Sequence, residues 1–198
     1  MRGSSGDRRF AARLAARMAE RGAHLSGHFL LSSGLHSTDY LQCALFLAHP
    51  ADAAWAGRVL ARRLAPLGAD LVVSPALGGL IIGHEVAKAL GVPFLFTERE
   101  GGEMRLRRFP HPGAARFLVV EDVFTTGKST RETAEVLEGQ GAIWVGAGSL
   151  VDRSGNPSLL PVPWRSLWAV SFPVYDPADC PCCREGLPLV KPGSRPQP

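Results

Sequence analysis

The chain has 198 residues, of which 45% are hydrophobic and 20% are charged, and its 22 lysines and arginines against 18 acidic residues give a formal charge of +4. This composition is typical of a folded globular protein and excludes a disordered chain, a collagen and a coiled coil. No apolar run approaches the roughly 20 residues that span a bilayer, so a membrane-spanning helix is not expected. The positive charge favours an anionic partner, and composition leaves nucleic acid, membrane and phosphorylated metabolites open.

The start of the chain and its cysteines point to a reducing cytoplasm. The segment before Asp7 lacks the apolar core of a secretion signal. Four cysteines are too few and too clustered for a disulfide scaffold; they are Cys43, Cys180, Cys182 and Cys183. We therefore expect a cytoplasmic location.

The first part of the chain predicts a helix, a strand-rich segment and a second helix. Phe10, Leu14 and Met18 recur every four residues, which predicts a helix from Asp7 to Arg21. Residues 28–47 are expected to form short strands around a turn. A second helix is expected over residues 51–65.

From residue 71 onward, short apolar runs alternate with helical segments. The expected strands are 71–73, 92–96, 117–120 and 143–151, and the expected helices are about 80–90 and 130–140. This alternation indicates an α/β fold with a parallel sheet covered on both faces. Ligands of such sheets bind beyond the carboxyl ends of the strands, which points to the loops at 74–79 and 121–130.

Two segments lack a clear period. Residues 97–116 are rich in charge, glycine and proline and predict either a disordered loop or a functional lid. The proline-rich segment from about Asp176 is expected to be irregular. The chain therefore divides into an N-terminal part (residues 1–50), a core (51–175) and an irregular tail (176–198).

The strongest motif is a strand that ends in Glu121 and Asp122 and leads into the loop Thr125-Thr126-Gly127-Lys128-Ser129. Small hydroxyl residues and glycine allow backbone N–H groups to converge on an anion, and a following helix adds positive potential. The loop is therefore predicted to hold a phosphate. The two carboxylates would repel that phosphate, so we expect them to face hydroxyl groups or a metal-bearing part of the same ligand.

The motif allows two other interpretations. A Walker A loop requires a glycine five residues before Gly127, where Asp122 stands, so that interpretation is rejected. The acids could also simply end a strand while Thr125 caps a helix. That second interpretation stays open at this point.

The acid pair and the loop after it resemble the phosphoribosyl pyrophosphate (PRPP) signature of the type I phosphoribosyltransferases. Further segments resemble the orotate phosphoribosyltransferase family. Residues 29–34, with Ser37 and Tyr40, resemble its substrate hood, and residues 74–79 resemble its pyrophosphate turn. Residues 150–153 resemble the strand end that carries its orotate-binding arginine. The resemblance implies the type I phosphoribosyltransferase fold, a parallel-core sheet flanked by helices with a small N-terminal hood.

That resemblance also implies an activity and its partners. Phosphoribose would pass from PRPP to orotate, giving orotidine 5-monophosphate and pyrophosphate in de novo pyrimidine synthesis, with Mg²⁺ held largely by the ligand's own oxygens. The enzyme would be a homodimer with shared active sites, whose lid cations reach into the neighbouring site. No basic stripe is interleaved with aromatic residues, so neither nucleic acid nor membrane is an expected partner.

The resemblance assigns roles residue by residue. Asp122, Arg99 and Arg105 would be catalytic, and Thr125 and Arg153 would bind orotate. A planar guanidinium pairs bidentately with a carboxylate, which suits Arg153 to that role. The residues that would bind PRPP are Glu121, Asp122, Val123, Phe124, Thr125, Thr126, Gly127, Lys128, Ser129 and Arg99.

The sequence also departs from the family pattern. The lid has Arg99-Glu100 where Arg-Lys is usual, and Gly78 and Ser32 stand where lysines of the pyrophosphate turn and the hood are usual. Either arginines replace those lysines or catalysis is weakened. The alternative functions are a purine phosphoribosyltransferase and a PRPP- or nucleotide-binding regulator of the same fold.

No metal site built from protein side chains is predicted. The three clustered cysteines lack the usual paired zinc spacing, and Cys43 is expected to be a small buried hydrophobe. The histidines show no metal spacing either and are interpreted as surface or core residues; they are His24, His28, His36, His49 and His84.

Overall fold

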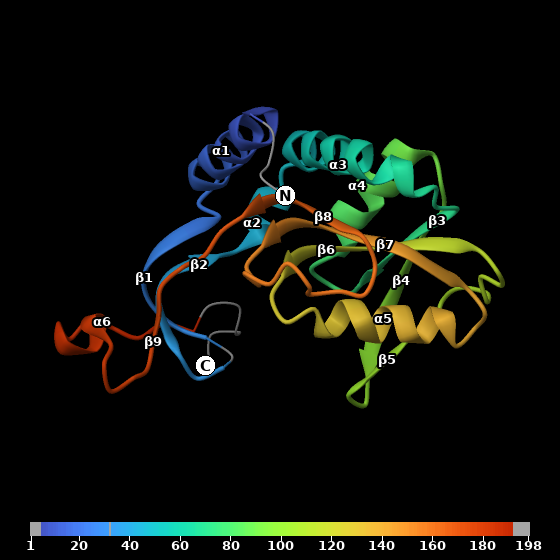
Figure 1. The fold of residues 1–198 in the computed structure, drawn as a ribbon. Coiled ribbons are helices and arrows are strands. Elements are labelled where there is room, and N and C mark those ends of the chain that lie inside the picture. Colours follow the sequence, from blue (N-terminus) through green and yellow to red (C-terminus); the bar gives the residue numbers. More distant parts are fainter. Residues whose placement is uncertain (1–4, 32, 192–198) are drawn as a thin grey trace.

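A six-stranded sheet forms the centre of the computed structural model, which describes residues 5–31 and 33–191 (Figure 1). In sheet order its strands are β5 (Glu103–Arg105), β4 (Phe94–Glu100), β3 (Leu71–Pro75), β6 (Arg116–Phe124), β7 (Ile143–Asp152) and β8 (Trp164–Ala169). All neighbours pair in parallel except β5, which is antiparallel to β4. The predicted parallel α/β sheet is therefore confirmed.

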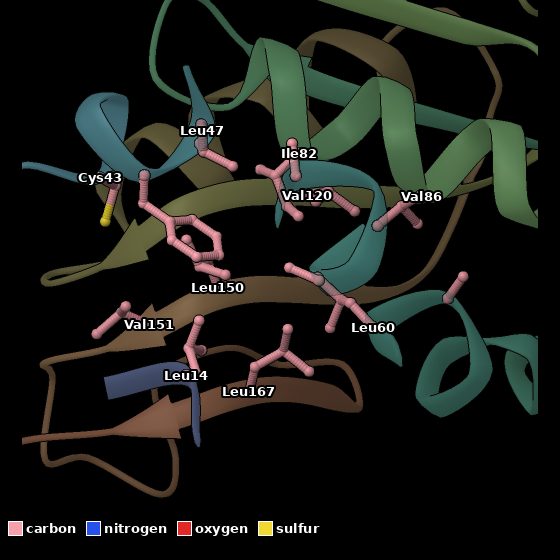
Figure 2. Packing of buried hydrophobic residues seen from close by; sticks show 14 of the residues in the cluster. Leu14, Cys43, Leu47, Leu60, Ile82, Val86, Val120, Leu150, Val151 and Leu167 are labelled. Carbon is pink, nitrogen blue, oxygen red and sulfur yellow. The ribbon is translucent and has the colours of Figure 1, made fainter. Parts of the chain in front are cut away.

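Both faces of this sheet are covered, because successive residues of its apolar strands point to opposite sides. Val72 and Val120 belong to one buried cluster, and Val73 and Val119 belong to the other. The first cluster lies beneath α1 (Ser5–Glu20), α3 (Pro50–Leu64) and α4 (Leu80–Leu90), and α5 (Lys128–Glu138) covers the opposite face (Figure 1). Figure 2 shows how the first cluster interdigitates, with Leu14, Leu60 and Leu167 at its lower side.

An ion pair attaches α1 to α3. Arg17 and Arg21 both bind the carboxylate of Asp52, whose side chain is only 3% exposed. Burial alone would raise the pKa of Asp52, but the two guanidinium groups outweigh it and lower that pKa. The first helix is therefore held by a shared buried anion as well as by Leu14 and Met18.

The N-terminal hood is a separate antiparallel sheet, shown at the left of Figure 1. It consists of β1 (His24–Leu30), β2 (His36–Leu41) and β9 (Val174–Tyr175), in that order. Strands were predicted over 28–47, but residues Cys43–Leu47 form the short helix α2, so that part of the prediction is wrong. The hood position Ser32 lies outside the described residues.

The segment after residue 175 is not wholly irregular. It contains the short helix α6 (Pro181–Arg184), and Val190 then returns to the hood beside β1. The amide of Leu30 donates to the carbonyl of Val190 at 2.8 Å, and the amide of Val190 donates to the carbonyl of His28 at 2.9 Å. The hood is therefore built from both ends of the chain.

The lid segment also has more order than was predicted. Strand β4 continues to Glu100, and a turn at Gly101 and Gly102 leads into β5. Both glycines have positive φ, 57° and 92°, which is the backbone region that favours glycine. The 3₁₀ turn Ala65–Leu67 (η1) completes the elements. Within the described residues, no helix is long and apolar enough to cross a membrane.

Candidate active site

The site lies where the direction of the sheet's connections reverses. Strand β3 leads through α4 to β4 on one side, whereas its neighbour β6 leads through α5 to β7 on the other side. The loops after β3 and β6 therefore leave the same edge in opposite directions and open a crevice between them. Gly78 and Asp122 meet in this crevice: a Cβ built on Gly78 would lie 2.7 and 2.8 Å from the two carboxylate oxygens of Asp122.

A cavity of about 830 Å³ occupies this crevice and extends under the hood. Five of the residues predicted to bind PRPP or orotate line it together: Asp122, Val123, Thr125, Thr126 and Arg153. Its other walls come from the hood, from α2, from the loop after β3 and the start of α4, from the loop after β7 and from the segment after α6. They include Leu30, Leu31, Tyr40, Gln42, Leu77, Ile81, Ser154 and Lys191.

The two adjacent carboxylates have different surroundings. Asp122 faces the cavity, and the amide of Val123 donates to its Oδ1 at 2.9 Å. Glu121 turns toward α5, where the hydroxyl of Thr130 donates to it. Burial raises the pKa of Glu121 to about 7, against the opposing effect of the Thr130 hydrogen bond, and burial also raises the pKa of Asp122. Burial therefore favours the protonated form of Glu121, and Asp122 is the carboxylate that lines the cavity.

The loop after the acid pair is shaped for an anion. The N-cap residue of α5 is Gly127, with a φ of 68°, and not Thr125. The interpretation in which Thr125 merely caps the helix is therefore wrong. The amide of Lys128 donates to the Thr126 hydroxyl at 3.3 Å, and Arg131 donates to the Thr126 carbonyl at 3.0 Å, which fixes the loop around the helix N-terminus.

The remaining residues of the motif do not line the cavity with their side chains. Phe124 is 1% exposed and packs edge-on against Trp164, so its side chain belongs to the core. Lys128 is exposed and lies 3.8 Å from Glu132. Ser129 follows it within the first turn of α5. These residues contribute backbone geometry and positive charge at the margin of the site.

Arg153 leaves the carboxyl end of β7 and forms the cationic wall of the cavity. Its amide donates to the carbonyl of Phe124 at 2.8 Å, and its guanidinium lies 5.3 Å from the ring centre of Phe172. Burial raises the pKa of Tyr40 while the nearby charge of Arg153 lowers it, which places both groups in one electrostatic environment. A planar cation beside a phenol is suited to a planar acidic ligand.

The lid arginines are paired and stand outside this cavity. Arg99 binds Glu132 on α5 and donates to the carbonyl of Gly102 at 2.5 Å. Arg105 pairs with Glu103 at 2.8 Å. Both arginines are at least partly exposed, Arg99 to 39% and Arg105 to 55%. Exposed ion pairs contribute only about 0–1 kcal/mol, so releasing these arginines to a ligand costs little. Glu100, which stands where a lysine is usual, pairs with Arg107 at 2.8 Å, so the lid acids Glu100 and Glu103 are both partners of lid arginines.

Two features of the site were not apparent in the sequence. Gly78, where a lysine is usual, leaves room that the Asp122 carboxylate fills. Lys191 lines the cavity beside Leu30 and Leu31 because the end of the described chain returns to β1. No local pattern marks Lys191, since its place depends on pairing between residues about 160 positions apart.

This topology, with its switch-point crevice and antiparallel hood, is that of the type I phosphoribosyltransferases. No family model matches the chain. The chain is 51% identical over 175 residues to the orotate phosphoribosyltransferase of Pelotomaculum thermopropionicum, covering 88% of this chain and 92% of that protein. It is 49% identical over 179 residues to the orotate phosphoribosyltransferase of Carboxydothermus hydrogenoformans, covering 89% of this chain and 94% of that protein.

A crystal structure of orotate phosphoribosyltransferase from Aeropyrum pernix gives a TM-score of 0.70 at 30% identity and covers 79% of this chain and 93% of that one. The chain belongs to the orotate phosphoribosyltransferase family. The resemblance inferred from the sequence is therefore confirmed, and the purine phosphoribosyltransferase and regulator alternatives are set aside.

Proposed function

We propose that the chain transfers the phosphoribosyl group of PRPP to orotate and releases pyrophosphate, as an enzyme of pyrimidine nucleotide synthesis in the cytoplasm. The observation that carries this proposal is that one cavity holds Arg153, Asp122 and the Thr125–Thr126 loop. An acidic base, a ribose and a phosphate each find a complementary group there. The four free thiols of the structure fit a reducing compartment.

The residues divide the work of a displacement at the anomeric carbon. The loop and the N-terminus of α5 would hold the 5-phosphate, and Asp122 would accept hydrogen bonds from ribose hydroxyls. Arg153 would pair with the carboxylate of orotate and aim its ring nitrogen at the sugar. A bond forms between that nitrogen and the anomeric carbon while the bond to the pyrophosphate oxygen breaks, so catalysis consists of positioning and charge stabilisation.

Mg²⁺ fits the oxygen donors of this cavity. It prefers carboxylate and substrate oxygens, and Asp122 is the carboxylate among the residues that line the cavity. When bound, the cation would neutralise charge on the pyrophosphate group. Glu121 is less suited to this role because the Thr130 hydroxyl and burial hold it at the sheet side.

A homodimer with shared sites would explain where the lid cations act. Arg99 and Arg105 lie on the β4–β5 hairpin and are not among the residues that line their own cavity. In a dimer, the hairpin of one subunit can approach the cavity of the other. Asp122→Ala and Arg99→Ala should each have a strongly reduced activity alone, and mixing the two kinds of subunit should then restore part of the activity. If the mixture stays inactive while hybrid dimers form, the sharing of sites is refuted.

The reaction itself is tested by following orotate consumption with PRPP and Mg²⁺. Wild type should consume orotate, and Arg153→Ala should lose about 2–5 kcal/mol of transition-state binding, a 30-fold to several-thousand-fold loss of kcat/KM for orotate. Arg62→Ala, on the exposed side of α3, is the matched control and should keep full activity. Turnover of adenine or hypoxanthine without turnover of orotate would overturn the assignment.

A further inference from the structure

Four potential metal ligands meet outside the active site, between the hood and the segment after β9. His28 and His36 come from β1 and β2, and Cys180 and Cys183 flank the start of α6. One ligand atom from each residue lies within 4.8 Å of all the others. The histidines were expected to be ordinary surface or core residues, but the fold places two of them against the cysteines.

The spacing of these atoms matches a tetrahedral site. For a zinc ion with bonds of about 2.3 Å to sulfur and about 2.05 Å to nitrogen, tetrahedral ligand atoms lie about 3.3–3.8 Å apart. The sulfur atoms of Cys180 and Cys183 lie 3.5 and 3.6 Å from Nε2 of His28, and the sulfur of Cys183 lies 3.3 Å from Nδ1 of His36. The two ring nitrogens are 2.8 Å apart and would need to separate by about half an ångström.

A second contact orients one of the imidazole rings. Nδ1 of His28 lies 2.9 Å from the carbonyl oxygen of Leu187. A carbonyl can only accept, so Nδ1 carries the proton and the lone pair of Nε2 points into the cluster. This is the arrangement found around metal-bound histidines, where the outer nitrogen donates to a carbonyl or carboxylate and fixes the tautomer.

Burial and charge also favour a cation. His28, His36 and Cys180 are 4%, 5% and 1% exposed, and only Cys183 reaches the surface. A divalent ion with two thiolates and two neutral imidazoles has no net charge and can be buried at little electrostatic cost. Two sulfur and two nitrogen ligands in a tetrahedral arrangement are characteristic of zinc.

We propose that His28, His36, Cys180 and Cys183 bind one Zn²⁺ ion in a closed structural site. The four protein ligands fill the tetrahedron and leave no position for a substrate, and none of them lines the active-site cavity. The ion would join the β1–β2 hairpin to the segment that carries α6. It would thereby hold Val190 on β1 and Lys191 at the cavity.

The experiment uses full-length, untagged protein prepared under reducing conditions without chelator. Metal analysis should find one zinc per chain in the wild type and in Cys182→Ser, the matched control, because Cys182 is buried in the same helix but is not one of the four ligands. Cys183→Ser and His36→Asn should lose the zinc. If the wild type takes up no stoichiometric zinc after incubation with Zn²⁺, or if Cys182→Ser loses it equally, the proposed site is wrong.

Cobalt substitution makes the test independent of how well the variants fold. Wild-type protein depleted of zinc and titrated with Co²⁺ should develop the intense visible bands of a tetrahedral site and a thiolate-to-metal charge-transfer band. It should reach saturation at one equivalent, and Zn²⁺ should then displace the signal. Weak bands of octahedral cobalt, or a titration without an end point, would overturn the proposal. Orotate turnover is measured separately, so a failed metal site leaves the proposed reaction untouched.

Discussion

Replacing Gly78 by alanine should disturb the active site through a single contact. The backbone at Gly78 is not in the positive-φ region, so alanine is compatible with its conformation. The new Cβ, however, would lie 2.7 and 2.8 Å from the oxygens of Asp122 and 2.9 Å from its Cγ. Because both oxygens are approached together, rotation of the carboxylate does not relieve the contact, and the Asp122 side chain has to retreat.

The size of the effect follows from that retreat. Contacts between a Cβ and another heavy atom are rarely shorter than 3.0 Å, so the carboxylate must move by at least 0.3 Å from its distance of 2.7 Å. Displacing a positioning group by about 1 Å costs about a hundredfold in rate, so a smaller movement should lower kcat/KM by about tenfold, or about 1.4 kcal/mol. The free energy of unfolding should fall by less than the ~1–3 kcal/mol of an overpacked core, because Asp122 borders an open cavity.

A double-mutant cycle provides the control. Steady-state kinetics with PRPP and orotate are compared for wild type, Gly78→Ala, Asp122→Ala and the double variant. If the glycine acts through Asp122, Gly78→Ala should have little further effect once the carboxylate is gone. A full tenfold loss from Gly78→Ala in the Asp122→Ala background, or no loss in the wild-type background, would refute the reasoning.

Three further predictions concern Glu121, Asp52 and Arg99. Between pH 4.5 and about 7 the folded state keeps the Glu121 proton that the unfolded state has lost, so the free energy of unfolding falls as pH rises. In denaturant unfolding, Glu121→Gln should therefore be more stable than the wild type by up to about 3 kcal/mol above pH 7 and equally stable below pH 4.5. A gain that does not depend on pH would contradict this. Asp52→Ala should lower the free energy of unfolding by about 1–3 kcal/mol at neutral pH, because Arg17 and Arg21 lose their shared anion. Since the pKa of Asp52 is lowered in the folded state, the difference from wild type should disappear as the pH falls below that pKa. An equal loss in acid would count against the ion pair. Arg99→Ala should lower kcat far more than it raises KM for PRPP, and an unchanged kcat would remove the lid from the mechanism.

The central sheet and the loop that connects β6 to α5 could be predicted because their signals are local. Strand β6, the acid pair and the start of α5 are continuous in sequence, so an apolar run, two carboxylates and small hydroxyl residues carry the information together. Strand β8 was missed because it is an edge strand with mixed burial and polar residues. The helix α2 was taken for strand because a short buried apolar run has no period that distinguishes the two.

The parts of the sites that the sequence did not predict depend on contacts between distant residues. Gly78 lies in the loop after β3 and Asp122 lies near the end of β6, and the pairing of these two strands brings them together. His28 and Cys180 lie 152 positions apart, and no local pattern connects the histidine to the cysteines. The local signal for the second site was the Cys-x-x-Cys spacing of Cys180 and Cys183.

The return of Val190 to β1 fixes an order of events during synthesis. Residues of β1 and β2 leave the ribosome first, and the strand and bridge that complete the hood, β9 and Val190, leave it more than 130 residues later. The sheet between them can fold as soon as its own strands are available, since domains form as they emerge. The hood edge, by contrast, stays without its partners until residue 190 is made. A newly made chain therefore acquires the loop after β6 before it acquires the cavity wall that Lys191 completes.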